Sequence, residues 1–267
     1  MDASAHTPAR ARPRDPMRAL RYLWRVPLLV AHLLIGLPVT LLLINPLSAR
    51  WRPGGERFDD RAIRGWSRML AGIFGLRVRR FGRPLPGGVV FVANHVSWID
   101  IEVLHATRMM GFVAKAEISR WPLVGWMARR GGTIYHHRGS NESLSGVLHQ
   151  MVARLGQGLA VGVFPEGGTG SGQTVRTFHA RIFEAAVVAA APVQPVALKY
   201  GRGGSAQTLV AFAPGESFVH NFLRMLGEPP RPVEVHYLAP VLHGSTQGRR
   251  RIAEACRARI LAAMEGG

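Results

Sequence analysis

Short apolar runs alternate with helix-forming segments along most of this 267-residue chain, and this alternation limits its possible folds more than any other feature. Runs typical of β-strands cover residues 76–81, 89–93, 110–114, 133–137, 159–164, 193–200, 208–213 and 233–238. Helical spacing of apolar residues predicts helices over residues 61–74, 99–107, 121–130, 143–155, 181–190 and 249–264. The pattern predicts an α/β fold with a mixed, largely parallel sheet flanked by helices.

A second feature is the apolar segment at residues 26–44, which has 19 residues, no charge and one histidine. About 20 apolar residues are needed to span a bilayer as a helix. Arginines flank this segment on both sides, whereas a simple span carries its basic excess on the cytoplasmic side only. We therefore expect the segment to dip into one leaflet and return, bending near Pro27, Gly36 or Pro38, with the flanking arginines against anionic headgroups. A single span and a buried hairpin are the alternatives.

We expect the chain to consist of two parts, the first of which contains this segment. Residues 1–70 form a basic N-terminal arm with a membrane-anchoring helical segment, and residues 71–267 form the α/β domain. Lys and Arg number 34 against 16 Asp and Glu, so the net charge of +18 predicts an anionic partner: a lipid surface, a phosphorylated substrate or nucleic acid. No nucleic-acid-binding motif is recognisable, so nucleic acid is not the expected partner. The single cysteine, Cys256, excludes a disulfide framework and a cysteine-based zinc site.

The sharpest motif is Asn94-His95-Val96-Ser97-Trp98-Ile99-Asp100, which directly follows a predicted strand. With His95 in the turn and Asp100 in the first turn of the next helix, the two side chains can meet. An aspartate that accepts a hydrogen bond from one imidazole nitrogen leaves the other nitrogen available as a general base. From spacing alone, the alternative is that Asp100 only caps the helix and His95 is an incidental turn residue.

Two further motifs also follow predicted strands. Residues 164–172 are rich in glycine, which lets backbone N–H groups approach a substrate, although a flexible turn has the same composition. The loop lacks the Gly-Lys-[Ser/Thr] ending of a phosphate-binding loop. Residues 132–138 end in Arg138, which suits a bidentate phosphate or carboxylate contact but is also compatible with one more solvated arginine.

Taken in order, these motifs resemble those of the glycerolipid acyltransferase family, typified by lysophosphatidate (1-acyl-sn-glycerol-3-phosphate) acyltransferases. The resemblance covers about residues 75–200, and four ordered motifs are far more specific than one. The first family motif matches Asn94, His95 and Asp100; the second Gly132, Ile134, Tyr135 and Arg138; the third Phe164, Pro165, Glu166 and Gly167; the fourth Val193, Pro195, Val196, Ala197 and Leu198. Lys115 matches the lysine that the family carries between its first two motifs.

The resemblance implies transfer of a fatty acyl group from acyl-ACP or acyl-CoA to a lysolipid hydroxyl, at the cytoplasmic face of the inner membrane. It also implies His95 as the general base and Asp100 as the residue that holds and charges the imidazole, with no cofactor or metal beyond the thioester co-substrate. The implied substrate-binding residues are Asn94, Lys115, Arg138, Glu166, Gly167 and Thr169.

One departure from the family pattern concerns the acceptor. The third motif usually continues with an arginine thought to help bind the acceptor's phosphate, but here Gly168 and Thr169 follow and the next arginine is Arg176. A Gly/Thr/Ser-rich continuation resembles the branch that acylates lyso-ornithine lipid, which has no glycerol phosphate. The sequence ranks lysophosphatidate first, because Arg176 or Arg181 can substitute, and lyso-ornithine lipid second. A non-catalytic basic protein that binds membranes or nucleic acid is the alternative from a different class.

Overall fold

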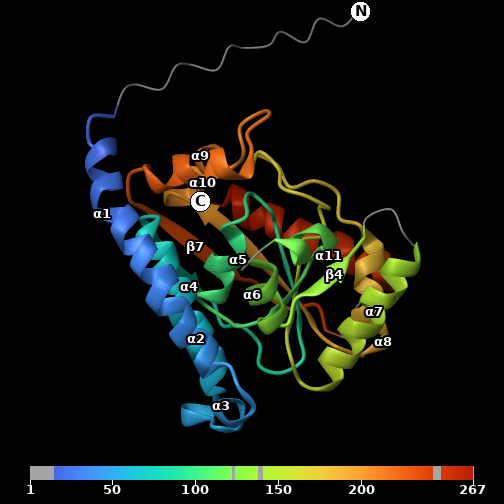
Figure 1. Ribbon diagram of the computed structural model, residues 1–267. Helices are drawn as coiled ribbons and strands as arrows, with labels where there is room; N and C mark the ends of the chain where they lie inside the picture. Colours follow the sequence, from blue (N-terminus) through green and yellow to red (C-terminus); the bar gives the residue numbers. More distant parts are fainter. Residues whose placement is uncertain (1–14, 122–123, 138–140, 243–247, 267) are drawn as a thin grey trace, which may run out of the picture.

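The computed structural model describes residues 15–121, 124–137, 141–242 and 248–266 (Figure 1). Within these residues one seven-stranded sheet has the order β1-β7-β6-β2-β5-β3-β4. Only the β6–β7 pairing is antiparallel, and every other neighbouring pair is parallel. The expected mixed, largely parallel sheet is confirmed. The strands are β1 (Leu76–Phe81), β2 (Val90–Ala93), β3 (Gly111–Lys115), β4 (Ile134–His136), β5 (Val161–Val163), β6 (Val193–Tyr200) and β7 (Arg231–Tyr237).

Helices cover both faces of this sheet, because the central strands are apolar on both sides. In β2 the side chains of Phe91 and Ala93 belong to one core and those of Val90 and Val92 to the other. This alternation follows from the two-residue period of a strand. The helices of the domain are α4 (Phe58–Ile73), α5 (Asp100–His105), α6 (Val124–Arg130), α7 (Asn141–Gly156), α8 (Glu184–Val188), α9 (Gln207–Val210), α10 (Phe218–Leu226) and α11 (Gly248–Glu265).

The structure corrects the sequence prediction in the segment after β6. Residues 208–213, predicted as a strand, contain the short helix α9 instead, and α10 was not predicted. The Gln207 side chain accepts from Tyr200 N (2.8 Å) and donates to Leu198 O (2.9 Å). These bonds hold the chain against β6 at the start of a helical turn. The strand prediction was wrong because a short apolar run alone does not distinguish a strand from a buried helix.

The N-terminal apolar segment also differs from expectation. α1 (Arg18–Ala31), a π-helical turn η1 (His32–Gly36) and α2 (Leu37–Leu43) form one continuous helix of 26 residues, the one helix among the described residues that is long and apolar enough to cross a membrane. The predicted bend near Gly36 or Pro38 is absent. The π-helical turn precedes Pro38, and the Thr40 hydroxyl donates to Gly36 O (2.8 Å).

The chain reverses only after α2. Asn45 caps the short helix α3 (Pro46–Arg50) by accepting from Leu47 N (2.9 Å) and Ser48 N (3.0 Å). From there the chain continues into α4, which packs against α1 and α2 (Figure 1). The His32 ring stacks on Trp66 of α4, with ring centroids 4.9 Å apart. The long helix is therefore attached to the domain along its length.

Side chains of α1 dock onto the C-terminal end of α10. Arg21 donates to Gly227 O (2.9 Å), the Tyr22 hydroxyl to Leu223 O (2.7 Å), and Arg25 to both Leu226 O and Glu228 O (2.8 Å each). The last carbonyls of a helix lack partners within that helix, so these donors complete α10. The expectation that the arginines before the apolar segment lie against lipid headgroups is therefore wrong for Arg21 and Arg25, and Arg25 is fully buried. Arg10, Arg12 and Arg14 lie outside the described residues.

Candidate active site

The first predicted pair of catalytic residues meets at the C-terminal end of β2. His95 lies in the turn after β2, Asp100 begins α5, and Nδ1 of His95 is 2.8 Å from Oδ2 of Asp100. Asp100 is fully buried, whereas the His95 side chain keeps 16% of its surface exposed. The bond at Nδ1 leaves Nε2 as the nitrogen free to exchange a proton with a substrate.

Backbone and side-chain donors hold the Asp100 carboxylate. Oδ2 accepts from Val96 N (2.7 Å) and Ser97 N (3.0 Å) in addition to His95, and Oδ1 accepts from the Tyr200 hydroxyl (2.5 Å). These donors therefore hold the Asp100 carboxylate in one orientation beside the imidazole.

The loop after β5 holds His95 from the other side. The buried carboxylate of Glu166 accepts from His95 N (2.8 Å) and from Arg176 N (2.9 Å), and Gly170 N donates to His95 O (2.8 Å). The His95 ring also stacks on Phe164, with centroids 4.0 Å apart. Oε1 of Glu166 thus links the third motif to the first, and Oε2 binds the backbone of Arg176 further along the loop.

Gly167 allows this loop to make its turn. Its φ of +75° is strained for a residue with a side chain, and a Cβ at this position would lie 2.8 Å from Nε2 of His179. A glycine after Glu166 therefore satisfies both the backbone geometry and the packing of His179.

The other predicted substrate-binding residues are spread over neighbouring strand ends. Asn94 is buried, and its side chain pairs with the backbone of Leu198 in β6 (Oδ1 to Leu198 N, 2.8 Å; Nδ2 to Leu198 O, 3.1 Å). Lys115 is exposed at the end of β3, opposite His136 of β4, and Thr169 is exposed in the loop after β5. Arg138 lies outside the described residues. Contacts of all these residues with substrate stay predictions.

Sequence reasoning missed the residues that support this pair. Tyr200 ends β6, which is parallel to β2, so its side chain reaches the same edge of the sheet as Asp100. Asn221 of α10 accepts from Trp98 Nε1 (3.0 Å) within the first motif. Tyr200, two residues after the fourth motif, was a signal for the first contact. The second had none, because α10 was not predicted.

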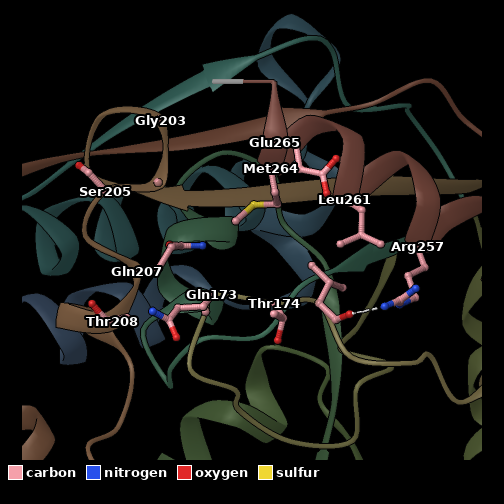
Figure 2. A pocket seen from close by; sticks show the side chains of 13 residues that line it. Gln173, Thr174, Gly203, Ser205, Gln207, Thr208, Arg257, Leu261, Met264 and Glu265 are labelled. Atoms are coloured by element: carbon pink, nitrogen blue, oxygen red, sulfur yellow. Dashed lines mark hydrogen bonds between the residues drawn. The ribbon is translucent and has the colours of Figure 1, made fainter. Parts of the chain in front are cut away.

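A cavity of about 500 Å³ adjoins the same loop but is separate from His95. Figure 2 shows its lining from the loop after β5, the segment before α9 and the end of α11, with Arg257 donating to Val175 O (2.7 Å). Neither His95 nor Asp100 lines it. The cavity therefore is not the site where the predicted base acts.

Comparison with known proteins identifies the family. A family model described as acyltransferase matches residues 78–199. The lyso-ornithine lipid O-acyltransferase of Pseudomonas aeruginosa is 34% identical over 84% of this chain and 86% of its own length, and the 1-acyl-sn-glycerol-3-phosphate acyltransferase of Neisseria gonorrhoeae is 39% identical over 47% and 49%. The chain therefore belongs to the acyltransferase family, as an O-acyltransferase of the lysolipid type. This confirms the resemblance drawn from the four motifs.

The fold agrees with that assignment. The crystal structure of the 1-acyl-sn-glycerophosphate acyltransferase PlsC from Thermotoga maritima superposes with a TM-score of 0.71, covering 93% of this chain and 95% of the other at 19% identity. At this identity the likeness shows that the fold is shared, including its mostly parallel sheet.

Proposed function

We propose that this enzyme transfers a fatty acyl group from a thioester donor to the free hydroxyl of a lysolipid, with His95 as the general base. The observation that carries the proposal is the 2.8 Å contact between His95 Nδ1 and the buried carboxylate of Asp100. Nε2 takes the hydroxyl proton as the oxygen attacks the thioester carbonyl carbon. The intermediate then collapses, the C–S bond breaks, and the imidazolium returns the proton to the leaving thiolate.

The acceptor that we propose is lyso-ornithine lipid, which reverses the order expected from the sequence. Relatives named lyso-ornithine lipid O-acyltransferases match this chain nearly from end to end, whereas the two Neisseria relatives named for lysophosphatidate match about half of it. The departure after Gly167 supports the same choice, because Gly168 and Thr169 stand where a phosphate-binding arginine is usual.

Lysophosphatidate is the second candidate, and one residue of the structure favours it. Arg176 lies beside Glu166 (Nε to Oε2, 3.6 Å), and 48% of its side-chain surface is exposed. Its guanidinium is placed next to the loop that holds His95, and Arg suits phosphate recognition. Its Nη2 donates to Gly168 O, so a phosphate would have to compete with that carbonyl.

Membrane attachment through one leaflet fits the N-terminal helix better than a full span. Buried residues of the helix, from Arg25 to Leu37, face the domain, so a helix crossing the bilayer would carry one side of the domain into the lipid. Its opposite side presents large exposed apolar residues, including Leu23, Leu34 and Leu42.

We place the enzyme at the cytoplasmic face of the inner membrane, beside anionic lipids. The proposed acyl donor is acyl-ACP or acyl-CoA, and nucleic acid is not a proposed partner.

An acceptor competition tests the choice of lysolipid. Membranes containing the full chain receive an equimolar mixture of lyso-ornithine lipid and lysophosphatidate with acyl-ACP or acyl-CoA, and His95→Ala membranes serve as the blank. The proposal predicts acylated ornithine lipid as the main product, by at least about tenfold. Phosphatidate as the main product, with its formation reduced by Arg176→Gln, would instead select the second candidate.

A further inference from the structure

We infer that Tyr200 is a positioning residue that fixes the Asp100 carboxylate, and through it the imidazole of His95, in the orientation needed for proton transfer. The inference rests on the proposed function for its catalytic consequence. Its structural part concerns contacts among Tyr200, Asp100 and His95 alone.

The two oxygens of Asp100 have different tasks. Oδ2 accepts from His95 Nδ1, Val96 N and Ser97 N, whereas Tyr200 is the partner that the described residues give to Oδ1. Rotation of the carboxylate about its Cβ–Cγ bond would break the hydrogen bonds at both oxygens. The Tyr200 hydroxyl is thus a separate restraint, on the oxygen opposite His95, that helps to keep Asp100 in the plane in which it meets the imidazole.

Tyr200 is itself held firmly in place. Its side chain is fully buried in the core that covers one face of the sheet, its N–H donates to Gln207 Oε1 (2.8 Å), and its carbonyl accepts from Ala206 N (2.7 Å). Burial, together with the neighbouring Asp100 anion, raises the pKa of Tyr200 well above its usual range. The hydroxyl therefore stays protonated and acts as a donor at every pH at which the enzyme works.

Among the described residues, few other charged side chains lie near the contacts of Tyr200, Asp100 and His95. Glu166 and Arg176 lie on the loop after β5, where the carboxylate of Glu166 is occupied by the backbone N–H groups of His95 and Arg176. His179 lies beside Gly167 on the same segment. Since Asp100 alone among these groups bonds to the His95 ring, a change in the charge density of its carboxylate passes directly to the base.

Removing the Tyr200 hydroxyl raises the density of negative charge on the Asp100 carboxylate. Without the Tyr200 donor, more of the negative charge is left for the imidazolium, so the base keeps its proton to higher pH. The carboxylate also gains freedom to rotate, which lowers the fraction of His95 in the productive orientation.

The chain offers a matched control for this experiment. Tyr237 of β7 is also a buried tyrosine, and its hydroxyl bonds with the Thr107 hydroxyl (2.8 Å) without touching Asp100. Tyr200→Phe and Tyr237→Phe each remove one buried hydroxyl from neighbouring strands of the full-length protein. Two readouts are measured for each variant: the pH–rate profile of lysolipid acylation, and the pH dependence of His95 modification by diethyl pyrocarbonate, mapped by mass spectrometry.

For Tyr200→Phe we expect kcat to fall about tenfold with KM changed less than about twofold. We also expect the acid limb of the rate profile and the midpoint of His95 modification to move up by about half a pH unit. Tyr237→Phe should leave all of these unchanged. Unchanged profiles in Tyr200→Phe, or equal shifts in both variants, would overturn the inference.

If Tyr200→Phe fails to fold, 3-fluorotyrosine at position 200 replaces it in the experiment, because it keeps the ring and makes the hydroxyl a stronger donor. The midpoint of His95 modification should then move to lower pH. An unchanged midpoint would refute the positioning role. His95 modification needs no lysolipid. A shift in modification without acylation of any lysolipid would therefore retain the Tyr200–Asp100–His95 linkage and reject the proposed function instead.

Discussion

At the scale of single residues, the motifs contain groups of two kinds. His95 is partly exposed and has one free ring nitrogen. Asn94, Asp100 and Glu166 are buried and bond to backbone groups, and Asp100 also bonds to two side chains. A motif residue therefore need not touch substrate to be required. It can instead fix the turn from which the base projects.

Glu166→Gln tests this supporting role. Glu166 accepts from two backbone N–H groups, one at each oxygen, and a glutamine can accept at only one of them. The amide group would then face a backbone donor in a buried position. We expect a loss of about 1–3 kcal/mol in the free energy of unfolding, together with reduced acyl transfer.

Thermal and denaturant unfolding in detergent would measure this loss. Glu254→Gln on the exposed face of α11 is the control and should be neutral. If Glu166→Gln were as stable as the wild type yet inactive, Glu166 would be acting on substrate and not as a support.

At the scale of elements, the contact between α1 and α10 links the long N-terminal helix to the candidate active site. Arg25 donates to the carbonyls that end α10, and Asn221 of α10 accepts from Trp98 in the catalytic turn. Arg25→Met would leave the carbonyls of Leu226 and Glu228 buried without this donor. We expect a loss of about 1–3 kcal/mol and faster amide hydrogen exchange in both α1 and α10.

The control for this prediction is Arg50→Met, because Arg50 lies exposed on α3. It should change neither stability nor exchange. Exchange that accelerates in α1 alone, with α10 still protected, would contradict the claim that Arg25 completes α10.

The packing of α4 on α5 should make stability depend on pH. Burial raises the pKa of Glu102 from 4.5 to about 7, although the Ser67 hydroxyl donates to it at 2.7 Å and opposes the shift. The folded state therefore binds more protons than the unfolded state between these values, and the free energy of unfolding decreases as the pH rises from 4.5 to about 7.

Glu102→Gln removes this dependence while keeping an acceptor for Ser67. Glu102 is only partly buried, which limits the size of the stability change. We expect the variant to be more stable than the wild type by about 1–2 kcal/mol near pH 8 and equally stable near pH 4.5. Urea unfolding at the two pH values checks this, and a variant that is less stable at both would show that the Ser67 contact requires the carboxylate.

How far the sequence predicts the structure also differs between elements. β1 and β6 have the predicted bounds, because a glycine with positive φ, Gly82 or Gly201, directly follows each strand. The predictions of a bend at Gly36 or Pro38 and of a strand at 208–213 were wrong. The structure of both segments depends on tertiary contacts, which no local sequence pattern contains. The His95–Asp100 pair was predictable from a turn and a helix start, but the Tyr200 contact depends on which strand lies beside β2.

At the scale of the whole molecule, we propose that the outward face of the α1–α2 helix lies against the membrane. Leu23 and Leu34 on this helix are 73% and 71% exposed, and Val188 on α8, at the other side of the domain, is 63% exposed (Figure 1). Leu23→Asp with Leu34→Asp should lower binding to anionic vesicles at least about tenfold without unfolding the protein. Val188→Asp should have no effect, and equal losses would refute this orientation.

In the proposed reaction, His95 acts as the base in acyl transfer to a lysolipid. Its role is measured by the rate of transfer of a labelled acyl group from acyl-ACP or acyl-CoA to lyso-ornithine lipid. The purified full chain is compared with its His95→Ala variant at matched folding. We predict that the variant loses a factor of about 10²–10⁴. A His95→Ala rate close to that of the wild type would contradict the account.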